Sequence, residues 1–121
     1  MFPITMNTSK ILSTFFVLAF LLILGGTVFA QVVVIDIKEE VDLGMVSYVK
    51  RAISEAEAKN ASVLLHVNTF GGRVDAAVQI RDVILNAKVP LTIAFIDKRA
   101  ISAGALISLS AKKSSCRPHL R

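Results

Sequence analysis

Three short apolar runs, rich in β-branched residues, constrain the fold of this chain more than any other feature. They lie at residues 31–37, 62–68 and 91–96, and each is typical of a β-strand. The segments that follow them have the spacing or the composition of helices. Strands that alternate with helices form right-handed βαβ units, so the sequence predicts an α/β fold with a parallel sheet.

The helices can be bounded from the same sequence. The first is expected between Asp42, which can cap it, and Asn60, which can end it. The second is expected from about Val74 to the residue before Lys88. The third is expected at residues 102–111, where small and aliphatic residues occupy most sides, which predicts a buried helix.

The N-terminal segment is expected to direct export. Lys10 precedes an uncharged apolar run at residues 11–29, and Ala30 is the kind of small residue that signal peptidase recognises. The run also approaches the roughly 20 residues of a membrane helix. Residues 1–30 are therefore predicted to be a signal peptide, with cleavage before Gln31 favoured, or a membrane anchor through residues 11–29. Both predict a location at the membrane or beyond it, outside the cytoplasm.

The net charge of +5 comes from outside the predicted domain. Residues 31–111 contain nine basic and nine acidic side chains, so the excess comes from Lys10 and the tail at residues 112–121. This balance, without a basic helix, argues against a nucleic-acid-binding surface. Cys116 has no second cysteine for a disulfide, and no Cys, His or carboxylate spacing suggests a metal site, so we expect no cofactor.

The last segment, residues 112–121, has no apolar period and is expected to be an irregular basic tail. Residues 31–111 alone offer three strands and a small core. We therefore expect an incomplete domain, the front part of a larger one, with a tail that ends early or follows a frameshift. A disordered terminus is the alternative explanation.

Two turns at the carboxyl ends of predicted strands are candidates for one shared site. Gly71 and Gly72 follow the second strand and Ser102 follows the third, and parallel sheets bind ligands at this edge. Backbone N–H groups beside a hydroxyl suit acyl transfer, which needs oxyanion donors and a nucleophile. Taken alone, such a serine is more often a helix cap, and such glycines more often form a turn.

A serine nucleophile needs a base, and no residue of this chain is a good candidate. The residues considered are better explained as packed, solvated or ion-paired side chains, or they lie in the tail. They are His66, Asp75, Asp82, Lys98, Arg99 and His119. A lysine beyond this chain is the expected base, because Ser–Lys pairs are an established variant of such sites.

Four segments of the sequence carry a family resemblance. They are Ile35-Asp36-Ile37, Thr69-Phe70-Gly71-Gly72-Arg73-Val74-Asp75, Lys88-Val89-Pro90 and Ile101-Ser102-Ala103-Gly104. With them, the chain from Val33 to about Ala111 resembles the membrane-bound serine proteases of the NfeD family. The protease domain of that family belongs to the ClpP/crotonase-like class and follows an export segment.

The resemblance implies roles for particular residues. The family's nucleophile falls on Ser102, and its oxyanion glycine falls on Gly72, with Gly71 beside it in the supporting turn. The N–H of Ala103 would complete the oxyanion hole. The family's catalytic lysine lies downstream of the serine, past the end of this chain. Peptide or membrane-protein substrates, homo-oligomeric assembly and the absence of a cofactor are also implied.

The sequence departs from the family pattern at Asn68 and Phe70, where the family has aspartate and proline, and the larger phenylalanine can reshape the pocket. The resulting expectation is a fragment of a membrane-associated Ser–Lys endopeptidase. One alternative is a non-catalytic binding or assembly fragment, or an inactive truncated product. A less favoured alternative is a crotonase-like acyl-CoA enzyme, against which the export segment argues because acyl-CoA substrates are cytoplasmic.

Overall fold

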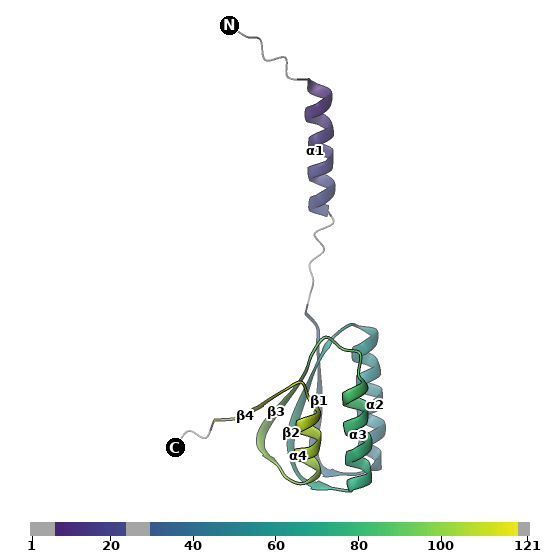
Figure 1. Ribbon diagram of the computed structural model, residues 1–121, viewed down its shortest axis with the longest axis vertical. Coiled ribbons are helices and arrows are strands. Elements are labelled where there is room, and N and C mark those ends of the chain that lie inside the picture. Colours follow the sequence, from purple (N-terminus) through teal and green to yellow (C-terminus); the bar gives the residue numbers. More distant parts are fainter. Residues whose placement is uncertain (1–6, 24–29, 119–121) are drawn as a thin grey trace.

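The computed structural model describes residues 7–23 and 30–118, and His119 therefore lies outside the described residues. The chain forms one parallel sheet with the strand order β1-β2-β3-β4, and helices connect successive strands (Figure 1). The predicted parallel α/β fold is confirmed. The elements are α1 Thr8–Ile23, β1 Val32–Val41, α2 Leu43–Ala58, β2 Ser62–Gly72, α3 Val74–Asn86, β3 Thr92–Ala100, α4 Ala103–Ser110 and β4 Lys113–Cys116.

The core lies between the sheet and the helices that cover one of its faces. Right-handed connections between neighbouring parallel strands place their helices on the same side, and α3 contacts both α2 and α4. Alternate strand residues such as Ile35, Leu65 and Ala94 are fully buried beneath these helices. The apolar stripe of α2 is buried as its spacing predicts. Its buried members are Val46, Val49, Ile53 and Ala56.

Helix α4 is less buried than its sequence predicts. Only one of its faces is buried, and this face consists of Ala103, Gly104, Ile107 and Ser108. Leu109 is 79% exposed on the other side. An aliphatic sequence therefore does not bury every face of a helix when only one face meets the sheet and α3.

The tail contains a strand that the sequence does not predict. Lys113–Cys116 forms β4, which pairs in parallel with Ile93–Ile96 of β3, so the sheet has four strands rather than the expected three. The expectation of an irregular tail is wrong for these four residues. The edge of β3 offers unpaired backbone groups, and these can pair with a polar segment as well as an apolar one. Arg117 then pairs with Asp97, with 2.6 Å between Arg117 Nη2 and Asp97 Oδ1.

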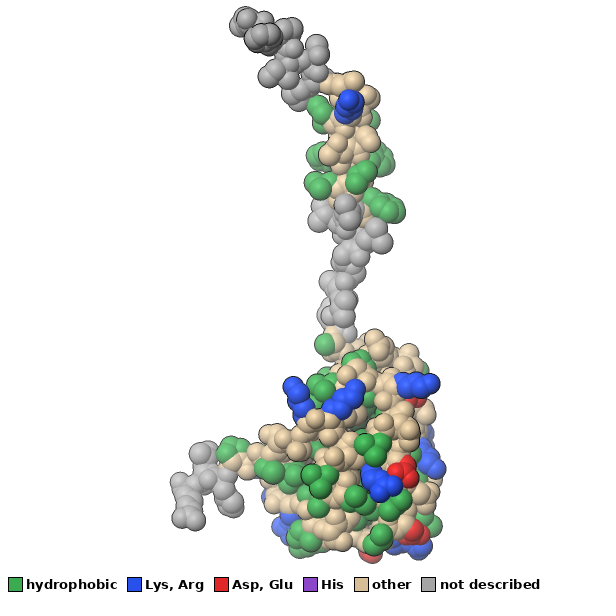
Figure 2. Space-filling model, in the orientation of Figure 1, with side chains coloured by type: hydrophobic (Ala, Val, Ile, Leu, Met, Phe, Trp, Pro, Cys, Tyr) green, Lys and Arg blue, Asp and Glu red, His purple; other side chains and the backbone are tan. Residues whose placement is uncertain are grey.

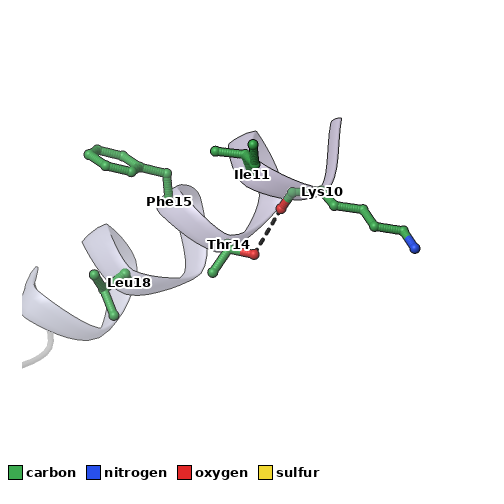
Figure 3. A pocket seen from close by; sticks show the side chains of 5 residues that line it. All are labelled: Lys10, Ile11, Thr14, Phe15 and Leu18. Atoms are coloured by element: carbon green, nitrogen blue, oxygen red, sulfur yellow. Dashed lines mark hydrogen bonds between the residues drawn. The ribbon is translucent and has the colours of Figure 1, made fainter. Parts of the chain in front are cut away.

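The predicted export segment is described only in part, by helix α1. Hydrophobic side chains gather on it (Figure 2), and Ile11, Phe15 and Leu18 line a shallow recess along it together with Lys10 and Thr14 (Figure 3). Among the residues that the structure describes, no helix has both the length and the apolar character needed to cross a membrane. Residues 24–29 of the segment lie outside the described residues.

Within the part of the chain that the structure describes, no helix covers the other face of the sheet, which carries ion-paired side chains. Asp36 Oδ1 lies 2.9 Å from both Lys38 Nζ and His66 Nδ1, and His66 Nε2 lies 3.9 Å from Asp97 Oδ2. The hydrogen bonds from Lys38 and His66 lower the pKa of the Asp36 carboxyl below its ordinary value of 3.8. His66 therefore links the side chains of three neighbouring strands.

This pairing predicts an acid-sensitive contribution to stability. Because the folded-state pKa of Asp36 is lowered, its ionised form stabilises the fold above about pH 4, and this contribution disappears as the pH falls through the folded-state pKa. The Asp36 side chain is 49% exposed, so we expect its ionisation to contribute less than about 1 kcal/mol to the free energy of unfolding. Urea unfolding should show Asp36→Asn less stable than wild type at pH 7, and this difference should be smaller at pH 3. An equal difference at both pH values would contradict the prediction.

Candidate functional site

The structure brings the two predicted turns together at the carboxyl edge of the sheet. Gly71 and Gly72 are the last two residues of β2, and Ser102 lies in the turn between β3 and α4. Thr69 pairs with Ala100 in the strand register, and its carbonyl accepts a hydrogen bond of 3.1 Å from the Ile101 N–H. Residues far apart in the sequence thus share one corner of the domain.

Ser102 occupies a strained corner between a strand and a helix. Its φ of 51° and ψ of −114° lie outside the regions that ordinary residues prefer, and such a conformation costs about 1–3 kcal/mol. It stands at the N-cap position of α4, yet within the described chain its side chain makes no capping hydrogen bond. The hydroxyl is thus on an exposed residue at a sharp strand–turn–helix corner, the arrangement of a nucleophile elbow.

Gly71 makes the close approach of the two turns possible. A Cβ built on it would lie 3.0 Å from Ser102 Cβ and 3.4 Å from the Ala103 nitrogen, and its φ is +115°. Gly72 faces the other way, because a Cβ on it would lie 2.6 Å from the Val41 nitrogen of β1. Its φ of +155° also disfavours a side chain. Both positions therefore need glycine, for different neighbours.

The N–H groups on either side of Gly72 have partners. The Gly71 N–H donates to Thr69 Oγ1 at 3.0 Å, and the Arg73 N–H donates to the Val41 carbonyl at 2.8 Å. Gly72 itself is exposed, whereas Ala103, the first residue of α4, is buried. Of the predicted site residues, the structure thus places Gly71, Ser102 and Ala103 in contact range and Gly72 at the rim.

Two hollows adjoin these turns. A pocket of about 250 Å³ is lined by Ser102 and four apolar residues, which are Val74, Ala77, Ala103 and Leu106. A second pocket, of about 380 Å³, is lined by the two glycines with Glu39, Glu40 and Phe70. The Arg99 guanidinium carbon lies 4.2 Å from the centre of the Phe70 ring, a cation–π contact at the site's mouth. The ring of Phe70, the residue that departs from the family pattern, is 70% exposed there.

Two of the side chains considered as bases, those of His66 and Asp75, have other partners. His66 bonds to Asp36 on the open face of the sheet. Asp75 accepts two hydrogen bonds from Arg73, at 3.0 and 2.8 Å, which lower the pKa of its carboxyl. None of the candidate bases that the structure describes lines the pocket that contains Ser102. Within residues 7–23 and 30–118, no three His, Cys, Asp or Glu side chains form a group that could hold a metal ion.

Two features of the site are missed by sequence reasoning. Thr69 is a buried polar side chain whose hydroxyl bonds to β1 at Glu39 and to Gly71 at the end of its own strand. Glu39 has a φ of +63° next to a break in the pairing of β1 with β2. A threonine in an apolar strand resembles any β-branched core residue, and no turn-forming residue marks the irregularity, so neither leaves a clear sequence signal.

Comparison with known proteins relates this chain to one family. The family model of the NfeD1b N-terminal domain matches residues 31–120. The membrane protein NfeD1b of Bacillus subtilis (strain 168) is 38% identical over 81 residues, which make up 66% of this chain and 18% of that protein.

Solved structures point the same way. The 1510-N membrane protease specific for a stomatin homolog from Pyrococcus horikoshii is 28% identical with a TM-score of 0.66, over 73% of this chain and 46% of that one. A lysine-to-alanine variant of the 1510-N membrane-bound stomatin-specific protease, in complex with a substrate peptide, is 27% identical with a TM-score of 0.66. The match covers 74% of this chain and 42% of that one. ClpP1 from Listeria monocytogenes shares the fold, with 24% identity and a TM-score of 0.55. The match covers 64% of this chain and 46% of that one. This chain spans less than half of each relative.

The Gly72 geometry predicts a large loss of stability on substitution. Gly72→Ala should destabilise the domain by about 2–4 kcal/mol, because the new methyl group would collide with the β1 backbone at Val41. Gly44→Ala is the control, since its methyl group would meet only the Asp42 side chain, and it should change stability by less than about 1 kcal/mol. Chemical denaturation of both variants tests this, and equal effects would contradict it.

Proposed function

Since this chain belongs to the NfeD1b N-terminal domain family, we propose that it is the front part of a membrane-associated serine endopeptidase with Ser102 as its nucleophile. The observation that carries the proposal is the exposed, strained Ser102 beside the backbone of Gly71. A serine held in this conformation at the start of a helix has no evident structural purpose, and strain of this kind gathers at functional sites.

In the proposed reaction, Ser102 Oγ attacks the carbonyl carbon of a peptide bond. The N–H groups of Gly72 and Ala103 stabilise the oxyanion that forms, and Gly71 supports the turn that presents them. The partners of the Gly71 and Arg73 N–H groups favour Gly72 as the donor from this turn. The N-terminus of α4 adds positive potential at the same place.

A base must remove the proton from the Ser102 hydroxyl, and we propose a lysine that lies beyond the described residues. Among the described residues that line the apolar pocket next to Ser102, none has a titratable side chain that could serve as this base. Variants of the 1510-N protease replace a serine in one case and a lysine in another by alanine, which favours a Ser–Lys pair for this fold.

The substrate we propose is a peptide segment of a membrane protein. The pocket beside Ser102 suits an apolar side chain, since its other lining residues are all apolar. NfeD1b is a membrane protein and the 1510-N proteases are membrane-bound, so we propose a membrane location on the extracytoplasmic side, with attachment through residues 11–29 if they are not cleaved. Assembly into homo-oligomers is part of the same proposal, and the reaction requires no cofactor.

The second candidate is a non-catalytic binding or assembly fragment. It is favoured by one observation, the absence of a base from the lining of the pocket that contains Ser102. Removal of one catalytic member typically lowers rates by orders of magnitude, so such a chain would retain the fold and binding surface without measurable turnover.

Covalent labelling separates the two candidates. A fluorophosphonate probe should label Ser102 in a version extended by the downstream coding sequence, and Ser102→Ala should abolish the label, because only an activated hydroxyl reacts readily. Ser110→Ala is the matched control, since Ser110 lies in the same helix and donates to the Ile107 carbonyl.

The outcomes are distinct. Labelling of the extended version alone would place the base beyond residue 121 and make the present chain inactive. Labelling of the 121-residue chain would refute the non-catalytic alternative. If the probe labelled neither version, the proposed nucleophile would be wrong.

A further inference from the structure

Thr69 is a buried polar residue at the centre of the site, although no role in the proposed reaction has been assigned to it. It is 1% exposed and lies in β2, two residues before Gly71. A buried hydroxyl is costly unless it forms hydrogen bonds, so its partners show what holds it in place.

The Thr69 side chain joins two segments through its hydroxyl. Oγ1 donates to the Glu39 carbonyl of β1 and accepts from the Gly71 N–H at 3.0 Å. Its methyl group packs beside Gly104 of α4, where an added Cβ would lie 2.6 Å from Thr69 Cγ2. The backbone carbonyl of Thr69 separately accepts from the Ile101 N–H, next to Ser102.

These contacts lie where the sheet loses its regular pairing. The register of β1 with β2 runs from Lys38 opposite Asn68 to Glu40 opposite Gly71, so β2 carries one extra residue. The register of β2 with β3 also shifts at Thr69. A ladder interrupted on both sides leaves backbone groups without regular partners, and the Thr69 hydroxyl binds two of them, Glu39 O and Gly71 N–H.

We infer that Thr69 is a positioning residue for the site. Its hydroxyl holds the Gly71 N–H toward β1 and thereby fixes the end of β2, where the backbone of Gly71 lies against Ser102. This assignment rests on the proposed function for its catalytic meaning, but the geometry it requires can be measured without any activity.

The direct test is amide exchange by NMR on the full chain in detergent micelles. Thr69→Val keeps the shape but removes the hydroxyl, so the Gly71 amide should exchange about tenfold faster, while Thr69→Ser should stay within about threefold of wild type. Thr92→Val is the matched control, because Thr92 is 2% exposed and its hydroxyl accepts from the distant Lys112 N–H. It should leave the Gly71 amide unchanged.

Equal Gly71 exchange in Thr69→Val and Thr92→Val would overturn the inference. If Thr69→Val does not fold, the wild-type chain still decides the matter. A slowly exchanging Thr69 hydroxyl proton with a nuclear Overhauser effect to the Gly71 amide supports the inference, and the absence of such a proton contradicts it.

A second measurement connects Thr69 with the reaction. In the extended version, fluorophosphonate labelling of Ser102 should fall about 10- to 100-fold in Thr69→Val and remain within about threefold of wild type in Thr69→Ser and Thr92→Val. No labelling in wild type, together with faster Gly71 exchange in Thr69→Val, would refute the proposed function and leave the Thr69 geometry supported. Normal labelling in Thr69→Val would overturn the positioning role.

Discussion

The site depends on a backbone approach that excludes a side chain between two turns. Gly71 lies so close to Ser102 and Ala103 that even a methyl group would press on both. This contact fixes the distance between the end of β2 and the start of α4, and the parallel order of the strands makes it possible because their carboxyl ends meet at one edge. The position of Ser102 relative to the end of β2 depends on it.

The strain at Ser102 persists because neighbouring contacts hold α4 in place. The unusual conformation costs about 1–3 kcal/mol, and burial of one large apolar side chain such as Ile107, which is fully buried, contributes about 1.5–3 kcal/mol. Gly104 adds to this by allowing α4 to pack directly against the methyl group of Thr69. The packing of α4 therefore offsets the strain at Ser102.

The sequence predicts the fold well where hydrophobic periodicity decides it. The parallel sheet and the buried face of α2 follow from the spacing of apolar residues. Burying an apolar face stabilises a helix or strand wherever it occurs, so this spacing predicts the same structure in any context. The sequence does not predict β4, because the backbone edge of β3 can pair with Lys113–Cys116 whatever side chains these residues carry. Within the site, the double glycine and the segment around Ser102 can be located from the sequence. The sequence does not show that Gly71 approaches Ser102 while Gly72 approaches Val41. The register shifts around Thr69 likewise have no signature in composition or period.

The apolar lining of the pocket bears on which base could serve Ser102. A lysine amine is protonated in water at neutral pH and cannot accept a proton, but an apolar environment disfavours its charged form and lowers its pKa. Val74, Ala77 and Leu106 provide such an environment beside the serine. A histidine would need a polar partner to orient its ring, and the residues that line this pocket offer none. The described residues that line this pocket include no base, and the same apolar lining suits the amine of a lysine.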